Sequence, residues 1–375
     1  MRLLLYTGPG GAGTSTLAAA SAHALAAAGH RVLLGAVDDD EDLRATINLL
    51  DPWPRDRLAL LDQPLSRPHA EWGKTQETLL TLLTRGGLDP AMAEEAPLLP
   101  GVGQVRAVLR LLAVARRTDA DLLVLDLGSL REAAELLSLP TRLVWTLRRL
   151  MAATPDLGAA MRTLSFVTGG RPGAGARFVS QALARTETLA HVLRSEQSRV
   201  RLVVGPSPGG LRALARWLPE LGLAGVYLDL VVRNGSAPAS GGWSAEDLAT
   251  HLPQAELVQL DTASTDLTQP QELARLVAPV SRQLSALDHP MMCLATRVEA
   301  DQDGFVLRIR IRPQPDESLR VQRRGDDLLL TLSGRRHLVP LSGGLRRCRV
   351  VQARQVDGEL QVHFRPEEGR WMRRD

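Results

Sequence analysis

Lysine is almost absent from this chain of 375 residues, in which Lys74 is the only one. The other basic residues are arginines, a bias that fits a GC-rich genome better than a chemical requirement. The absence matters most in phosphate-binding loops, where a lysine normally supplies positive charge to the phosphates. Any such loop in this chain must do without that ammonium group.

Cysteines, aromatic residues and long apolar runs are also scarce. The two cysteines, Cys293 and Cys348, are too few for a disulfide framework and cannot form a zinc site on their own. We therefore expect no zinc site and two buried thiols in a reducing cytoplasm. No run of 18 apolar residues occurs, so we expect no transmembrane segment.

Basic charge gathers toward the C-terminus, where residues 291–375 hold 17 arginines against 12 acidic residues. The two signs are interleaved along this segment, which is typical of a solvated surface. Aromatic residues make up only 3% of the chain, and single-stranded nucleic acids are bound by stacking on aromatic side chains. We therefore expect no nucleic acid partner.

Apolar strands alternate with helical segments through the first part of the chain. Residues 1–37 predict a strand, a loop, a helix over Thr14–Ala28 and a second strand. Further apolar strands are predicted at 119–128, 198–207 and 225–236, each next to a helical segment. Strands that are apolar on both faces and alternate with helices favour a parallel sheet covered by helices, which is the α/β class.

Two segments depart from this alternation. Residues 131–199 have helical periodicity without a convincing strand, and they predict a helical insertion in a first domain over 1–287. From Met291 the apolar period changes to two, as in the stretch from Phe305 to Ile311. Short alternating strands with turns between them predict a small antiparallel β-sandwich over 291–375. The hinge is expected at residues 285–290.

The glycines from Gly8 to Gly13 fit two different motifs. The spacing G-x-G-x-x-G matches the dinucleotide-binding fingerprint, and it also matches a P-loop frame with Thr14 at the lysine position and Ser15 at the magnesium-ligand position. In the dinucleotide fold an acid follows about 20 residues later. Here Asp38, which closes the second strand, lies 25 residues beyond Gly13. That spacing favours the phosphate loop and leaves a dinucleotide-dependent oxidoreductase as an alternative.

Four stretches together resemble one family of P-loop proteins. They are the loop Gly8–Thr16, the strand and acid "LLGAVDDDEDL" around Asp38, the segment from Asp126 to "LLSLP", and the strand "LVVRNGSAP" with Asn234. In sequence they are similar to the deviant Walker A ATPases that drive arsenical pumps or target tail-anchored proteins. Residues 291–375 resemble the small-heat-shock-like (α-crystallin) sandwich of one branch of that family.

The resemblance implies a P-loop NTPase fold, ATP or ADP and Mg²⁺ as cofactors, and a homodimer. It assigns Asp38 to the water-activating position and a Mg²⁺ site to Ser15 and Asp126. A polypeptide client or a metalloid pump would be the partner. The nucleotide-binding positions that it implies are Gly8, Gly10, Gly11, Ala12, Gly13, Thr14, Ser15, Thr16 and Asn234.

Three departures from the family pattern bear on the chemistry. The two lysines of the family loop match Pro9 and Thr14, and losing one such electrostatic contact costs ~3 kcal/mol, on the order of 100-fold in rate. Five acids in a row, Asp38–Asp42, would repel a triphosphate, although such a run can also bind a divalent cation. Leu130 and Arg131 replace the Thr and Gly of the second switch. Arg131 is a candidate replacement cation, but a solvent-facing helix arginine is the simpler interpretation.

We therefore expect an eroded family member that binds nucleotide weakly and hydrolyses ATP slowly or not at all. A nucleotide-independent, chaperone-like or scaffold protein that binds a polypeptide client is the alternative. A dinucleotide-dependent oxidoreductase is the weakest hypothesis, because it rests on the glycine spacing alone.

Overall fold

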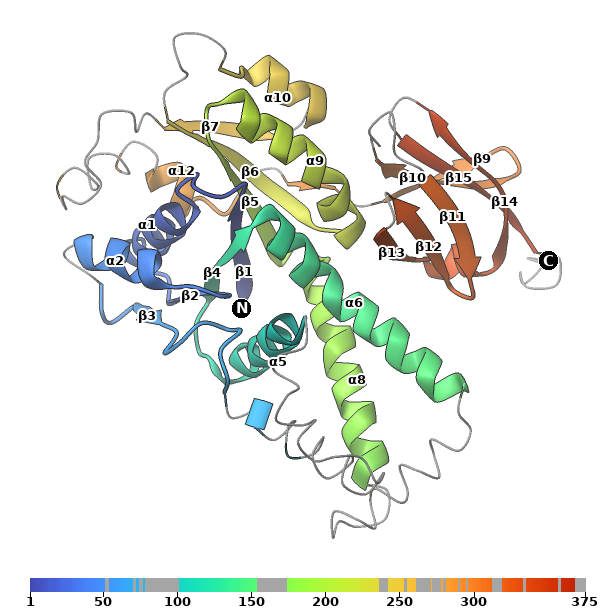
Figure 1. Cartoon of the computed structure of the whole chain (residues 1–375), viewed down its shortest axis with the longest axis horizontal. Coiled ribbons are helices and arrows are strands. Elements are labelled where there is room, and N and C mark those ends of the chain that lie inside the picture. The colour runs from blue at the N-terminus through green and yellow to red at the C-terminus, as the bar shows by residue number, and fades with distance from the viewer. Residues whose placement is uncertain are drawn as a thin grey trace.

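The computed structural model describes an α/β unit followed by an all-β unit (Figure 1). The described residues are 1–50, 54–69, 72–73, 77, 101–153, 174–235, 242–252, 255–260, 271, 278, 281–288, 291–294, 296–311, 319–332, 335–356 and 359–367.

A parallel sheet with the order β3-β2-β4-β1-β5-β6-β7 forms the centre of the first unit. An additional short strand, β8, pairs antiparallel with β6. The strands are β1 (Arg2–Gly8), β2 (Val32–Ala36), β3 (Leu58–Leu60), β4 (Leu122–Ser129), β5 (Ser198–Val204), β6 (Tyr227–Asn234), β7 (Glu256–Leu260) and β8 (Met292–Cys293). The predicted α/β class with a parallel sheet is confirmed. The sequence assigned the residues of β8 to the second domain. In the structure, β8 belongs to the first sheet, because it pairs with β6 and its Met292 is buried in the core of the first unit.

Helices cover both faces of this sheet, which explains why its strands are apolar on both sides. Leu4 and Tyr6 of β1 pack in one core cluster with helices α1, α2 and α12, whereas Leu3 and Leu5 pack in another with α5, α6, α8, α9 and α10. The helices are α1 (Thr14–Ala27), α2 (Glu41–Leu49), α5 (Val102–Arg117), α6 (Leu130–Ala153), α8 (Ala174–Leu193), α9 (Pro208–Ala224), α10 (Ala245–His251) and α12 (Ser281–Ser285).

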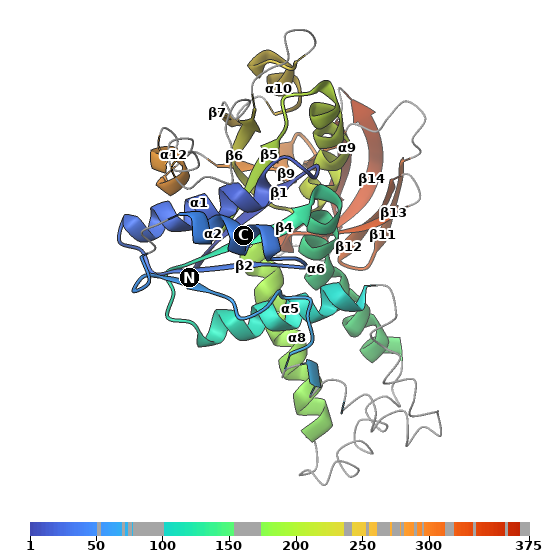
Figure 2. The same cartoon turned by 60° about the vertical axis from the view of Figure 1, so that its left-hand side comes forward.

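The predicted helical insertion over 131–199 differs from the structure at its start. Helix α6 follows β4 directly, and its first turns are buried on the sheet through residues such as Leu130 and Leu137. Only the far ends of α6 and α8 extend beyond the sheet (Figure 2). The strand predicted at 198–207 is confirmed, because β5 begins at Ser198 and ends at Val204. Residues 154–173 of this segment lie outside the described part of the chain.

The second unit consists of two antiparallel sheets, with the orders β14-β15-β10-β9 and β11-β12-β13. Its elements are β9 (Arg297–Asp301), β10 (Gly304–Arg310), β11 (Leu319–Arg324), β12 (Asp327–Leu332), β13 (Arg335–Pro340), the short helix α13 (Gly343–Arg346), β14 (Cys348–Val356) and β15 (Glu359–Pro366). The predicted inward face is confirmed for Leu307, Ile309 and Ile311, which are buried in one core with residues of β12 and β15. Phe305 is only partly buried at the margin of that core.

Helix α9 joins the two units. Leu223, near the end of α9, is buried in the core of the sandwich although its helix covers the first sheet. One turn earlier, Glu220 places Oε2 3.1 Å from Nε2 of His337 on β13. The guanidinium of Arg335 lies over the Trp217 indole, 4.8 Å from its centroid. Apolar packing, the Glu220–His337 contact and the Arg335–Trp217 contact therefore hold the sandwich against α9.

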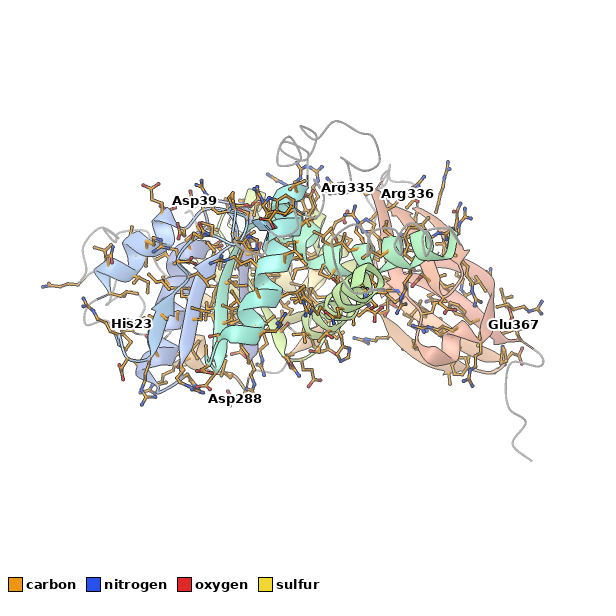
Figure 3. The ribbon with its side chains drawn as sticks, turned by 90° about the horizontal axis from the view of Figure 1, so that it is seen from below. His23, Asp39, Asp288, Arg335, Arg336 and Glu367 are labelled. Carbon is orange, nitrogen blue, oxygen red and sulfur yellow. The ribbon has the colours of Figure 1, made fainter. Side chains whose placement is uncertain are left out.

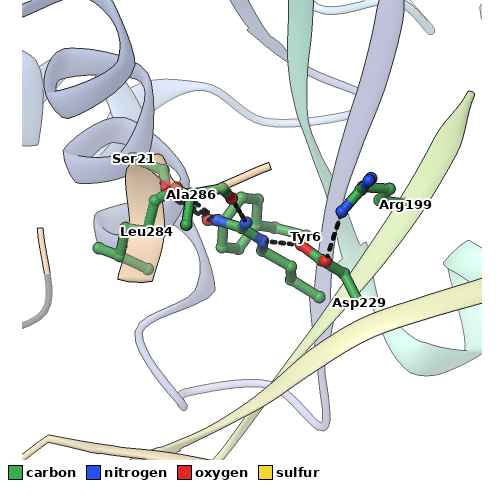
Figure 4. A network of polar contacts seen from close by, with 7 residues as sticks. Tyr6, Ser21, Arg199, Asp229, Leu284 and Ala286 are labelled. Carbon is green, nitrogen blue, oxygen red and sulfur yellow. Dashed lines mark hydrogen bonds and ion pairs between the residues drawn. The ribbon is translucent and has the colours of Figure 1, made fainter. Parts of the chain in front are cut away.

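A buried polar network links the end of the first unit to its sheet (Figure 4). Arg201 of β5 is fully buried, and its Nε lies 2.6 Å from Oδ2 of Asp229 on β6. The same guanidinium donates to the carbonyl oxygens of Leu284 (2.6 Å) and Ala286 (3.0 Å) and to the Tyr6 hydroxyl (3.0 Å). Because buried polar groups are costly when unpaired, this network holds α12 in place only while it is complete.

None of the helices in the described ranges is long and apolar enough to cross a lipid bilayer. The two thiols are both free. Cys348 is buried, as predicted, and donates to the Gly344 carbonyl oxygen, whereas Cys293 on the edge strand β8 is only half-buried.

Candidate nucleotide-binding site

A glycine-rich loop connects β1 to α1 and exposes its backbone. Gly10, Gly11 and Gly13 have φ angles of 91°, 63° and 83°, in the left-handed region that favours glycine. Gly13 is the N-cap of α1, where no side chain caps the helix and the first turn holds no acid. Backbone N–H groups at such a helix N-terminus form a cradle that suits phosphate.

Two of the loop glycines are also required by close packing. A Cβ at Gly8 would lie less than 3.0 Å from the carbonyl oxygen of Val203 on β5 and 2.9 Å from the Thr14 hydroxyl. A Cβ at Gly13 would lie 2.5 Å from the Asn234 side-chain amide. Backbone packing therefore requires glycine at position 8, and the left-handed φ of 83° together with the close Asn234 side chain favours glycine at position 13.

We expect Gly8→Ala to lower the free energy of unfolding by about 1–3 kcal/mol, because the added methyl group meets backbone that cannot move freely. Gly205→Ala is the matched control, since nothing lies within 4 Å of a Cβ there. The control is expected to stay within about 0.5 kcal/mol of the parent. Urea denaturation followed by tryptophan fluorescence measures both, and equal midpoints for the two variants would contradict the packing argument.

Ser15 and Asp126 meet at the carboxyl end of the sheet. Ser15 Oγ donates to Oδ2 of Asp126 at 2.5 Å, and the backbone N–H of Gly128 donates to Oδ1 at 2.9 Å. Asp126 is 4% exposed, and burial raises the pKa of its carboxyl above the ordinary value although both hydrogen bonds oppose the shift. Asp42 and Glu132 raise this pKa further through their negative charge. A cation here would relieve that concentration of negative charge, so the residues fit a Mg²⁺ ion.

Asn234 ends β6 directly behind the loop. Its Nδ2 donates to the carbonyl oxygen of Ala12 at 2.7 Å, while its Oδ1 is buried without a hydrogen-bond partner in the described part of the chain. The structure thus brings the predicted Asn234 to the predicted loop, although 222 residues separate it from Ala12. Because none of the described residues donates a hydrogen bond to Oδ1, this oxygen could accept a hydrogen bond from a ligand.

The acidic run forms the N-terminus of α2. Asp39 accepts a hydrogen bond from the N–H of Glu41 at 3.0 Å, and Asp40, the N-cap, pairs with Arg44 at 2.5 Å. Acids at this end of a helix are favoured by the helix dipole. Asp38 is exposed just beyond β2. Sequence reasoning missed this helix start, although acids directly before the apolar period of "LRATINLL" signal one.

The structure supports neither a divalent cation site at the acidic run nor Arg131 as a replacement cation. In the described ranges, no group of three or more His, Cys, Asp or Glu residues is placed to hold a metal ion. The Arg131 side chain is 64% exposed and donates to Glu135, one turn along α6, at 3.1 Å. Arg131 is therefore a surface helix arginine in an ion pair, and the structure does not place it as a replacement cation.

The structure brings the other predicted residues together as one site. The loop residues Gly8, Gly10, Gly11, Ala12, Gly13, Thr14, Ser15 and Thr16 run continuously from β1 into α1. Asp126 at the end of β4 and Asn234 at the end of β6 contact this loop. Fold and site thus define a P-loop-type α/β protein with a sandwich attached through α9.

Two family models match this chain. The model described as "Anion-transporting ATPase" (ArsA) matches residues 1–242, and the model of the HSP20-like domain found in ArsA matches residues 302–364. The chain therefore belongs to the ArsA ATPase family. This membership favours the phosphate loop over the dinucleotide fingerprint for the glycines that follow β1.

Two proteins with similar sequences match nearly the whole chain, and a third matches part of it. An uncharacterized protein of Streptomyces coelicolor is 32% identical over 100% of both chains, and a protein of Mycobacterium tuberculosis is 27% identical over 99% of this chain and 97% of its own. A Chlorobaculum tepidum protein named as an arsenical pump-driving ATPase is 27% identical over 62% of this chain and 61% of its own. A crystal structure of a ParA family ATPase from Chlorobium tepidum covers 76% of this chain and 94% of its own at 14% identity, with a TM-score of only 0.34.

Proposed function

We propose that this protein is a nucleotide-binding member of the ArsA family in which ATP hydrolysis is slow or absent. The observation that carries the proposal is the Ser15–Asp126 hydrogen bond at the end of a glycine cradle whose two cation positions hold Pro9 and Thr14. The parts that bind phosphate are kept, and the parts that stabilise transferred charge are missing.

Binding would use groups that the fold already positions. Backbone N–H groups of Gly10, Gly11 and Gly13 would face the phosphates. The family resemblance implies that Asn234 would contact the adenine base. The Ser15 hydroxyl would hold Mg²⁺ directly, and Asp126 would hold it through a water molecule. When bound, the ion would offset phosphate charge that no lysine offsets here.

Hydrolysis needs preorganised positive charge around the transferred phosphoryl group. Pro9 and Thr14 are neutral, and Arg44 is already committed to Asp40 and to the carbonyl oxygen of Leu61. Asp38 stands at the end of β2, where it could activate a water molecule, but this base alone cannot stabilise the charge of the transition state. We therefore propose binding without efficient turnover.

The assembly part of the proposal is a homodimer in the cytoplasm with nucleotide near the interface, as the family resemblance implies. The resemblance implies that the family lysine at the position of Pro9 reaches across to the partner's nucleotide. Proline cannot make that contact, so we propose that nucleotide does not close this dimer.

Calorimetric titration tests the proposal with ATP and ADP in the presence of Mg²⁺, and with NAD. ATP and ADP are expected to bind and NAD is not. Ser15→Ala should weaken Mg²⁺-nucleotide binding roughly tenfold, since hydrogen bonds and ligation to charged groups are worth about 1.5–3 kcal/mol. Thr250→Ala, which removes an exposed hydroxyl on α10, is the matched control and should leave binding unchanged.

Turnover is measured on the same samples. No phosphate release above that of Asp38→Asn is expected. Rapid ATP hydrolysis that falls at least tenfold in Asp38→Asn would overturn the claim of impaired catalysis. Failure of both ATP and ADP to bind would overturn the claim of nucleotide binding.

A nucleotide-independent scaffold that binds a polypeptide client is the second candidate. It is favoured by the projection of α6 and α8 beyond the sheet and by the attached sandwich (Figure 2). Equal suppression of client aggregation with and without ATP would support it. Absence of any suppression would count against it.

A further inference from the structure

A cavity of about 550 Å³ lies where α5, α6 and α9 meet strand β13 of the sandwich. Figure 3 shows Arg335 and Arg336 at this junction between the helices and the second unit. The volume is typical of small-molecule sites, which are usually about 300–1,000 Å³ and often lie between domains. The cavity is separate from the Ser15–Asp126 site and shares no lining residue with it.

Positive charge exceeds negative charge around the cavity. Its ionised side chains are four arginines and two glutamates: Arg131, Arg142, Arg335, Arg336, Glu135 and Glu220. Glu135 is paired with Arg131, and Glu220 lies 3.8 Å from Arg335 and 3.1 Å from His337. Arg142 and Arg336 form no ion pair within the described ranges, and both are exposed. Two guanidinium groups, one from α6 and one from β13, are therefore available to a ligand.

The other walls add to this positive potential. Gly101 and Gln104, from the N-terminus of α5, line the cavity, and no side chain caps that helix. Gly101 has φ 88°, and the first turn contains no acid. The N–H groups at this end carry partial positive charge, which adds to that of the arginines.

Trp217 orients the guanidinium of Arg335 before any ligand binds. The guanidinium of Arg335 lies 4.8 Å from the centroid of the Trp217 indole, which restricts its orientation and leaves its outer N–H groups for a ligand. A held guanidinium loses less conformational entropy when it binds a carboxylate or phosphate, whose oxygens match its fork geometry.

We propose that this cavity binds a small molecule with two or more anionic groups, carboxylates or phosphates. One anionic group would lie between Arg142 of α6 and Arg336 of β13, and another near Arg335. The ligand would bridge α6, which directly follows the strand that carries Asp126, to the sandwich. Its binding would therefore stabilise the two units against each other. The proposal does not depend on nucleotide binding at the glycine loop.

The test is calorimetric titration of the full chain, without Mg²⁺, with inorganic pyrophosphate and with citrate. Arg142→Gln/Arg336→Gln is expected to weaken binding about tenfold or more, since charge-assisted hydrogen bonds are lost. The matched control is Arg212→Gln/Arg216→Gln, which removes two exposed arginines of α9 outside the cavity and should leave binding unchanged. Binding of pyrophosphate alone, if it is lost in Arg142→Gln/Arg336→Gln, would assign phosphate ligands to the cavity, and binding of citrate alone, lost in the same variant, would assign carboxylates.

A second readout locates the ligand. Tryptophan fluorescence should change on titration, and the change should be lost in Trp217→Phe while circular dichroism shows an intact fold. Equal affinity of the two double variants, or absence of heat with both probes, would overturn the proposal.

Discussion

Asp229→Ala is expected to lower the free energy of unfolding by about 3–5 kcal/mol, because it leaves the guanidinium of Arg201 buried without its counter-charge. Both side chains are fully buried, and Nε of Arg201 lies 2.6 Å from Oδ2 of Asp229. Arg199, which lies 3.1 Å from Oδ1 of the same carboxylate, loses its partner too. Urea denaturation of the full chain measures the change.

Asp303→Ala is the matched control for this prediction. Asp303 pairs with Arg365 at 2.9 Å, but their side chains are 72% and 51% exposed, so the solvent screens the pair. Its loss should cost under about 1 kcal/mol. If both variants shift the denaturation midpoint equally, the buried network of Arg201 does not have the energetic role assigned to it.

The second large effect is expected at the phosphate loop, where Thr14→Lys should tighten Mg²⁺-ATP binding about 10- to 100-fold. Thr14 is the first residue of α1, and its hydroxyl lies next to Gly8 at the start of the loop. An ammonium group at this position would meet the phosphates that the backbone N–H groups already face. The same calorimetric titration as for the parent protein measures the gain.

Thr250→Lys controls for a general effect of added charge, because it places the same ammonium group at an exposed position of α10, outside the loop. It is expected to change affinity by less than about threefold, since solvent and salt screen a charge that lies away from the phosphates. Equal tightening by both variants would show a non-specific charge effect. No tightening by Thr14→Lys would show that phosphate does not enter the cradle.

Local patterns predicted much of the fold. Strands that are apolar on both faces and alternate with helices predicted the parallel sheet, and the apolar period of two from Phe305 to Ile311 predicted the buried face of the sandwich. The grouping of Ser15, Asp126 and Asn234 followed from a resemblance, because residues so far apart in sequence cannot be placed together by periodicity. Their contacts in the structure agree with that grouping, while their roles toward nucleotide remain proposals.

What could not be predicted depends on contacts distant in sequence. Arg201 bonds the carbonyl oxygen of Leu284, 83 residues away, and no local period points to that partner. A signal did exist, since Arg201 and Asp229 are opposite charges in two neighbouring apolar strands. The acidic run was interpreted as repulsive charge beside a ligand, whereas Asp39 and Asp40 also serve the start of a helix. The basic cavity is formed by four separate elements, so it has no linear motif at all.

Because Leu223 of α9 is buried among the sandwich strands, the hydrophobic core of the second unit is complete only with a residue from the first unit. A fragment that began at residue 291 would expose to solvent the apolar side chains that contact α9. The β-sandwich thus packs against helix α9 of the first unit, and any rotation between the two units must expose Leu223 to solvent.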